Sequence, residues 1–202
     1  MSESDSVYEK HYAGYLEELS RIDLTHHASI LDITFDNDRT ATVPFLGSVY
    51  RVSLEGIEDD SGRRPDYGTC VILCRYLLMC PDRVPTADDW VHFRDFKESG
   101  PLTTYFNENA EGAVARRFSG EIAGLRAVAE TLGGTDPGLD LAYDLTFRFR
   151  VLPRVPVLLL FNDADDEFPA QCTLLFERRA EQFLDAECLA MVGAYLAGTL
   201  TE

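Results

Sequence analysis

Positive charge is scarce in this chain. Lysine occurs only as Lys10 and Lys97, and Lys and Arg together number 18 against 35 Asp and Glu, a formal net charge of −17. Binding to phosphate backbones needs a basic face, so this balance argues against a nucleic-acid-binding protein. It also argues against attachment to an anionic membrane surface. Cationic ligands, metal ions and basic partner proteins remain open, as does an acidic surface that only keeps the protein soluble.

Several other features are missing. No apolar run approaches the roughly 18 residues of a membrane-spanning helix. The first residues, MSESDSVYEKHY, lack the basic and apolar segments of a secretory signal, so we expect a cytoplasmic protein. None of the HExxH, GxSxG or P-loop patterns of common hydrolases and nucleotide-binding proteins occurs. The sequence therefore names no reaction.

Cysteine is present in an odd number, five, which without a signal peptide favours reduced thiols. Cys70 and Cys74 are four residues apart and share a helix face, whereas Cys80 lies rotated from both and further along the axis. We therefore expect small buried thiols and no iron–sulfur cluster held by this chain alone. The remaining two are Cys172 and Cys188.

At 202 residues the chain predicts a single α+β domain over 1–202, with residues 1–6 as a frayed tail. Helical apolar periodicity defines the main helices. Asp66 or Thr69 is expected to cap one of them and Asp185 another. The predicted helices cover 7–24, 67–80, 119–132 and 186–200, with two short ones at 102–107 and 110–118.

Strands are expected in two regions. Residues 29–54 contain strand-like runs interrupted by a turn at Asp36-Asn37-Asp38, and 55–65 is a polar loop. Residues 141–151 alternate, with Arg148 and Arg150 on a face that is either wet or paired to acids. We expect a mostly antiparallel or mixed sheet packed against the helices, and a duplicated β-β-β-α unit is one interpretation of the similar order at both ends.

The stretch 152–176 is the most distinctive in the sequence. An apolar run, Val155 to Phe161, predicts a buried strand, and a second run follows at 172–176. Between them lies the acidic loop, defined here as residues 162–169. Its carboxylates are the main site candidates: Asp163, Asp165, Asp166 and Glu167.

The acidic loop allows three interpretations. Asp163, Asp165 and Glu167 alternate as hard-cation ligands do, which predicts a divalent-metal site, although the glycine and the final glutamate of an EF-hand are absent. Clustered carboxylates can also perform acid–base chemistry when one pKa is raised by its neighbours. The third interpretation is a solvated hairpin loop. Arg94, Arg148 or Arg154 could neutralise the acids.

A short extended piece at 85–96 contains the only tryptophan. Val91 and Phe93 are expected to face inward, with Trp90, His92 and Arg94 facing elsewhere. Exposed Trp90, Tyr105 and Phe106 would suit self-association, and Trp90 would also suit ligand contact. Glu187, in the first turn of the last helix, is a further candidate, and we hypothesise that it faces the same cleft as the acidic loop.

The chain resembles the family called domain of unknown function 3786. The residues that carry the resemblance are Asp165 to Ala170 (DDEFPA), Leu175-Phe176, Phe183 to Glu187, and Trp90 to Arg94. Weaker matches are Leu132 to Gly134, Leu152 to Pro156, Phe45 to Tyr50 and Tyr76 to Leu78. Cys188 stands where the family often has an acid. The resemblance covers nearly the whole chain.

The family has no assigned activity, so the resemblance carries over no catalytic residue. It implies a setting in anaerobic bacteria and archaea, linked to corrinoid and iron–sulfur proteins. We therefore expect a binding or accessory module acting on a small-molecule ligand or a protein partner. The alternatives are a small divalent-metal-dependent hydrolase or lyase using the acidic loop, and a structural self-associating protein. The sequence leaves the oligomeric state open.

Overall fold

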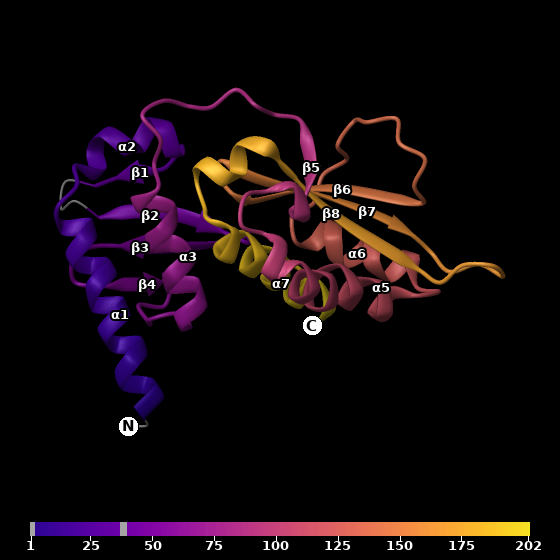
Figure 1. The fold of residues 1–202 in the computed structure, drawn as a ribbon, viewed down its shortest axis with the longest axis horizontal. Helices are drawn as coiled ribbons and strands as arrows, with labels where there is room; N and C mark the ends of the chain where they lie inside the picture. Colours follow the sequence, from indigo (N-terminus) through magenta and orange to yellow (C-terminus); the bar gives the residue numbers. More distant parts are fainter. Residues whose placement is uncertain (1–2, 37–39) are drawn as a thin grey trace.

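The computed structural model describes residues 3–36 and 40–202. Within these residues the strands form two four-stranded antiparallel sheets, and helices pack on them (Figure 1). The predicted α+β class is confirmed, with two sheets where the sequence suggested one. The turn predicted at Asp36-Asn37-Asp38 lies partly outside the described residues. Residues 1–2 of the expected frayed tail also lie outside them, and residues 3–6 belong to the first helix, Glu3–Ser20.

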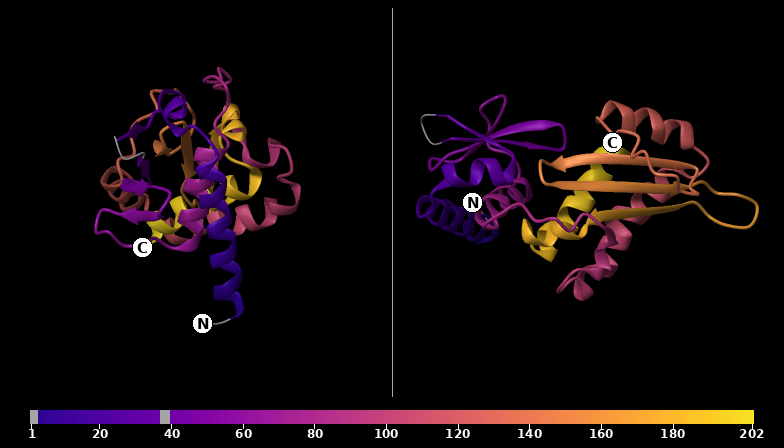
Figure 2. Two further views of the ribbon diagram at one scale, coloured as in Figure 1. Left: turned by 90° about the vertical axis from the view of Figure 1, so that its left-hand side faces the viewer. Right: turned by 90° about the horizontal axis from the view of Figure 1, so that it is seen from above.

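Sheet A is a meander in the order β1-β2-β3-β4. It sits with α1, α2 and α3 at one end of the molecule (Figure 2). Its strands are β1 (Thr34–Phe35), β2 (Ala41–Phe45), β3 (Ser48–Val52) and β4 (Ile57–Asp59). Its helices are α1 (Glu3–Ser20), α2 (Leu24–Leu31) and α3 (Tyr67–Leu78).

Sheet B, in the order β5-β8-β7-β6, forms the other end. Strand β7 lies between β6 and β8 and is buried along almost its whole length, as its continuous apolar run predicts. The strands are β5 (Trp90–His92), β6 (Leu145–Leu152), β7 (Val155–Asn162) and β8 (Gln171–Glu177).

Most of the helices that follow α3 pack around α7, which contacts α3 as well as α4, α5 and α6. Asp185 caps α7 by accepting a 2.9 Å hydrogen bond from the Cys188 amide, and Asp66 caps α3 in the same way through Thr69. The cap at Asp185 was predicted, and at α3 the structure selects Asp66 from the two predicted candidates, Asp66 and Thr69. The helices are α4 (Thr103–Phe106), a π-helical turn (Asn107–Glu111), α5 (Gly112–Phe118), α6 (Ile122–Thr131) and α7 (Ala186–Thr201).

One continuous apolar cluster joins the two sheets. It includes Val43 and Val52 of sheet A, Cys74 of α3, Phe176 of sheet B and Leu196 of α7. Cys70 and Cys74 are buried in it, which confirms the packing role expected of these thiols. Helix α7 thus contributes to the packing of both ends of the chain. No helix within 3–36 and 40–202 is both long and apolar enough to cross a bilayer.

Two local predictions were wrong. Residues 29–31 belong to α2 and not to a strand; Asp32 follows the helix with a positive φ of 57°, and strand β1 begins only at Thr34. The loop predicted over 55–65 contains β4, which pairs with β3. The two short helices expected over 102–118 are joined by the π-helical turn.

The duplicated unit stays a prediction. Each sheet does contain three consecutive antiparallel strands followed by a helix, β2-β3-β4-α3 and β6-β7-β8-α7.

Alternation along sheet B gives it two different faces. Phe149, Val157 and Phe176 are cross-strand neighbours on the face that joins the apolar core. Arg148 and Arg150, one residue before and after Phe149, point to the opposite face. That second face of sheet B, near the β6–β7 turn, carries the candidate site.

Candidate anion-binding site

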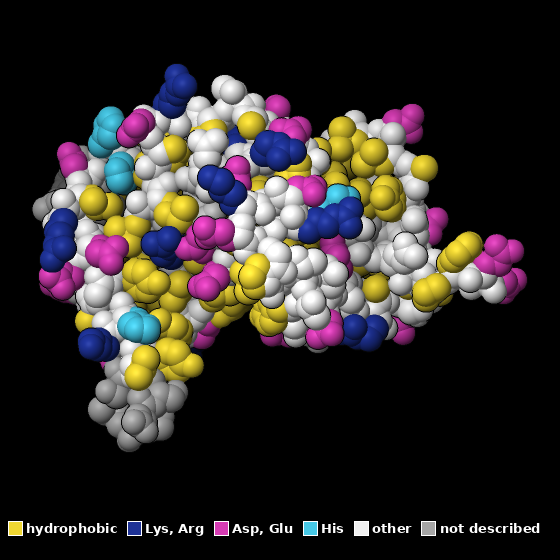
Figure 3. All heavy atoms as spheres, in the orientation of Figure 1, with side chains coloured by type: hydrophobic (Ala, Val, Ile, Leu, Met, Phe, Trp, Pro, Cys, Tyr) yellow, Lys and Arg dark blue, Asp and Glu magenta, His cyan; other side chains and the backbone are white. Residues whose placement is uncertain are grey.

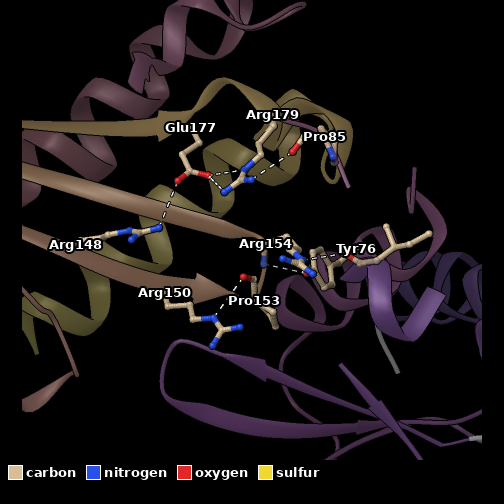
Figure 4. Close-up of polar contacts among 9 residues, drawn as sticks. Tyr76, Pro85, Arg148, Arg150, Pro153, Arg154, Glu177 and Arg179 are labelled. Atoms are coloured by element: carbon tan, nitrogen blue, oxygen red, sulfur yellow. Dashed lines mark hydrogen bonds and ion pairs between the residues drawn. The ribbon is translucent and has the colours of Figure 1, made fainter. Parts of the chain in front are cut away.

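A cavity of about 450 Å³ opens beside β6 and the β6–β7 turn. Four of its lining side chains are arginines, and we call it the arginine cavity (Figure 4). The lining comprises Arg148, Arg150, Arg154, Arg179, Asp32, Gly133, Thr135, Pro153 and Pro156. Its size is within the usual range of small-molecule sites, and it lies where the two ends of the molecule meet, a common location for such sites.

Glu177 holds two of the arginines in place. Glu177 is only 4% exposed, and its carboxylate accepts a 2.6 Å hydrogen bond from Arg179 Nε. The other carboxylate oxygen lies 3.4 Å from Arg148 Nη2. Arg179 also donates to the Pro85 carbonyl at 3.3 Å. The buried carboxylate of Glu177 fixes both arginine side chains, but its single negative charge neutralises only one of their two positive charges.

Arg150 reaches across to sheet A's end of the molecule. Its guanidinium forms an ion pair with Asp32, the residue that follows α2, and its Nε donates to the Pro153 carbonyl at 3.4 Å. Arg150 and Asp32 are both more than half exposed, so this pair contributes little to stability. A ligand anion could therefore compete with Asp32 for Arg150.

Arg154 is held by backbone groups. Its Nε donates to the Ile30 carbonyl at 2.8 Å and its Nη2 to the Ser29 carbonyl at 3.0 Å. Its backbone amide donates to the Tyr76 hydroxyl at 3.1 Å, as Figure 4 shows. Among the residues that the structure describes, no carboxylate forms an ion pair with Arg154. Its positive charge is therefore fixed in position but not neutralised.

Tyr76 makes this arrangement possible. It is fully buried, and its hydroxyl donates to the Leu31 carbonyl at 2.7 Å while accepting the Arg154 amide. Burial raises the pKa of Tyr76 well above its ordinary value, so the hydroxyl stays protonated and keeps donating.

The charges around the arginine cavity do not cancel. Four arginines face two carboxylates, Asp32 and Glu177, which leaves an excess of about two positive charges in a chain of net charge −17. Acidic side chains are spread over the molecular face seen in Figure 3. A local positive excess in an acidic protein favours a small anion with two negative charges.

Trp90 borders the same region from β5. It lies opposite Glu177 in the β5–β8 register, and the guanidinium of Arg148 is 5.9 Å from its ring centroid. This is within range of a cation–π interaction. Two of the residues proposed from sequence, Trp90 and Arg154, are therefore at or beside the arginine cavity. The predicted inward orientation of Val91 and Phe93 is also observed.

The acidic loop lies elsewhere, at the projecting tip of the β7–β8 hairpin (Figures 1 and 3). Asp163 Oδ1 accepts hydrogen bonds from the Gly120 and Ala164 amides, at 2.6 and 2.8 Å. Asp165 Oδ1 accepts from the amides of Glu167 and Phe168, which lowers the pKa of Asp165. These contacts shape the loop.

The remaining predicted residues do not join the acidic loop. Glu187 is in the first turn of α7, a helix that packs against α3, α4 and α5, and Figure 1 shows α7 well separated from the hairpin tip. Arg94 lines a separate cavity of about 230 Å³ with His92, Asn107 and Glu111. Burial raises the pKa of Glu111, opposed by the Leu174 amide that donates to it at 3.0 Å and by His92 and Arg94.

No group of three or more His, Cys, Asp or Glu side chains is arranged to hold a metal ion in the part of the chain that the structure describes. The divalent-cation site at Asp163, Asp165 and Glu167 stays a prediction, as does any role for Asp166.

Sequence reasoning overlooked Arg150, Arg179 and their acidic partners as site residues. The available signal was the Arg148–Arg150 alternation on β6, followed four residues later by Arg154. That alternation predicts a face that is either wet or paired to acids, and both hold: Arg148 and Arg150 are 47% and 64% exposed and pair with Glu177 and Asp32.

Comparison with known families agrees with the sequence resemblance. The model for the domain of unknown function DUF3786 matches residues 23–199. The chain belongs to the DUF3786 family. No curated protein and no solved structure matches it. The match includes every residue that lines the arginine cavity, and it begins after α1. The cavity is therefore built wholly from the part of the chain that the family shares.

Proposed function

We propose that this DUF3786 protein is a binding protein for a small dianionic ligand, whose phosphate group or paired carboxylates lie in the arginine cavity. The observation that carries the proposal is Arg154. Its guanidinium is fixed by two backbone carbonyls, lines the cavity and pairs with no carboxylate in the described chain. A positioned cation without an acidic partner is available to an oxyanion.

The neighbouring arginines support the same ligand class. Arg148 and Arg179 are oriented by Glu177, so little side-chain entropy is lost when they bind an anion. Planar guanidinium groups match the oxygens of phosphate and carboxylate, two hydrogen bonds at a time. The excess of about two positive charges favours a dianion over a monoanion.

Direct binding measurements test the proposal. Isothermal titration calorimetry with inorganic phosphate and with succinate should show binding, and acetate should bind much more weakly. Arg148→Gln and Arg150→Gln should each weaken phosphate binding about tenfold, since each removes one charge-assisted contact. Affinity should fall as salt concentration rises.

Arg117→Gln is the matched control. Arg117 is 49% exposed and paired with Glu121 on the surface, much as Arg148 is 47% exposed and paired with Glu177. The control should bind phosphate as the wild type does. Absence of binding by both dianions, or equal losses in the control and the cavity variants, would contradict the proposal.

The other hypotheses keep their own support. The family resemblance underlies an accessory role beside corrinoid or iron–sulfur enzymes, and the carboxylates of the acidic loop underlie a metal-dependent hydrolase or lyase. Tyr105, at 45% exposed, and Phe168, at 61%, are compatible with self-association or a protein partner, whereas Phe106, expected to be exposed, is buried at 1%. The contacts at the arginine cavity favour ligand binding over these alternatives.

A further inference from the structure

A second, apolar pocket adjoins the arginine cavity. It has a volume of about 200 Å³ and shares two lining residues, Gly133 and Arg150, with the cavity. We call it the apolar pocket. Its other lining residues are Leu46, Gly47, Leu132, Phe149, Val151, Leu196 and Thr199.

The two spaces lie on opposite sides of the edge strand β6. Arg148 and Arg150 point toward the arginine cavity, whereas Phe149 and Val151 point toward the apolar pocket, as alternation along a strand requires. Two backbone contacts bracket this stretch of the β6 edge. Thr135 N donates to the Arg148 carbonyl at 2.9 Å, and Leu46 N donates to the Val151 carbonyl at 3.0 Å.

Gly133 lines both spaces and has no side chain to separate them. This residue ends α6 with a positive φ of 77°, and a Cβ built on it would meet no heavy atom within 4 Å. A ligand that extends from the arginines around the β6 edge therefore meets no side chain at Gly133. It would next contact the apolar side chains of Leu132, Phe149 and Leu196.

We propose that the ligand of the arginine cavity carries a short apolar substituent, aromatic or branched, which lies in the apolar pocket. This inference rests on the proposed function, because the anionic group anchors the ligand. The class is a phosphate monoester, a phosphonate or a dicarboxylate with a compact hydrocarbon group. A long acyl chain does not fit a pocket of this size. The apolar walls stabilise a hydrocarbon group better than a sugar or a nucleobase, whose polar atoms would lose hydrogen bonds to water.

The test compares two phosphonates that share one head group. Methylphosphonate and phenylphosphonate are titrated into the full chain by calorimetry. Phenylphosphonate should bind at least tenfold more tightly, because transfer of its phenyl ring from water into the apolar pocket is favourable. Equal affinities would overturn this inference and leave the proposed function standing. Absence of binding by both would overturn the proposed function and this inference with it.

Thr199→Phe locates the effect. Thr199 is half-buried on α7 and lines the pocket, so a phenyl ring there should fill it. The variant should bind methylphosphonate as the wild type does and lose the tenfold advantage of phenylphosphonate. Thr201→Phe, on the same helix but outside the lining, should keep that advantage.

Unchanged methylphosphonate binding also shows that the variant is folded. If Thr199→Phe fails to bind methylphosphonate, Leu132→Trp fills the pocket from the end of α6 and is judged by the same two titrations. A phenylphosphonate advantage that persists in a variant with intact methylphosphonate binding would contradict the placement of the substituent in the apolar pocket.

Discussion

The Glu177 carboxylate accepts a 2.6 Å hydrogen bond from Arg179 Nε, and Glu177 is only 4% exposed. Glu177→Gln removes the charge that holds Arg148 and Arg179 and leaves two guanidinium groups without their anion. Breaking a buried ion pair is strongly destabilising, and the partial exposure of both arginines reduces the effect here to about 2 kcal/mol. Urea unfolding measures this change.

The same substitution should strengthen anion binding. With Glu177 neutral, the positive excess in the arginine cavity rises by one charge, so phosphate affinity should increase several-fold. A variant that is less stable yet binds phosphate more tightly would distinguish a binding site from a purely structural ion-pair cluster. Weaker phosphate binding by a folded Glu177→Gln would show that orientation of the arginines matters more than net charge.

Gly193 permits close packing of α7 against α4. A Cβ at Gly193 would overlap Phe106 Cε2 and lie 3.0 Å from Phe106 Cζ. Phe106 cannot move aside, because it is 1% exposed and stacked on Phe93 at a centroid distance of 4.4 Å. We expect Gly193→Ala to lower the free energy of unfolding by about 2–3 kcal/mol. Thermal or urea unfolding measures the loss.

Gly198, on the same helix, is the matched control. Nothing lies within 4 Å of the position that a Cβ would take there, so Gly198→Ala should stabilise the protein by roughly 0.5–1 kcal/mol through helix propensity. Equal effects at the two glycines would show that the α4–α7 contact is not rigid.

Asp185 should make stability depend on pH in the acid range. Burial alone would raise the pKa of Asp185, but hydrogen bonds from the Cys188 amide and from Arg75, whose Nε is 2.9 Å away, outweigh it and lower the pKa. The folded pKa lies below the unfolded value of about 3.9. The stabilisation is therefore complete above about pH 5 and is lost as pH falls through the folded pKa.

Asp185→Asn tests this linkage, because asparagine keeps a capping oxygen but cannot titrate. Between pH 7 and pH 3 the free energy of unfolding should fall less in Asp185→Asn than in the wild type. Urea unfolding at several pH values gives both slopes. Identical slopes would mean that other carboxylates account for the acid sensitivity.

The divalent-cation hypothesis for the acidic loop makes a separate prediction. Millimolar Mg²⁺ or Ca²⁺ should raise the melting temperature of the wild type, since a ligand that binds only the folded state stabilises it. Asp165→Asn should abolish the rise, and Asp60→Asn, at an exposed acid outside the loop, should keep it. Identical melting curves with and without either cation would leave the loop as a hairpin turn.

Features that depend on local pattern were predictable from the sequence. The continuous apolar run of β7, the caps at Asp66 and Asp185 and the alternation of β6 each depend on neighbours within a few residues. The acidic loop was also located correctly, at a strand–loop–strand turn, but its isolation at a hairpin tip depends on the whole fold.

The site itself depends on contacts between distant segments. Arg150 and its partner Asp32 are 118 residues apart, and Arg154 is bonded to the carbonyls of Ser29 and Ile30. No local pattern encodes such a pairing. The short helix α2 was not predicted, because its last residues run directly into the alternating residues that lead to β1, and the left-handed backbone of Asp32 that separates helix from strand has no local sequence signal.

The Tyr76 hydroxyl links the two ends of the molecule. It joins the end of α2, through the Leu31 carbonyl, to the β6–β7 turn, through the Arg154 amide. The arginine cavity therefore exists only when both ends of the molecule are docked on each other. An anion that binds there should slow exchange of the backbone amides around Leu31 and Arg154 with deuterium, although these segments belong to opposite ends of the molecule. Slower deuterium exchange at these two segments would thus report that the arginine cavity is occupied.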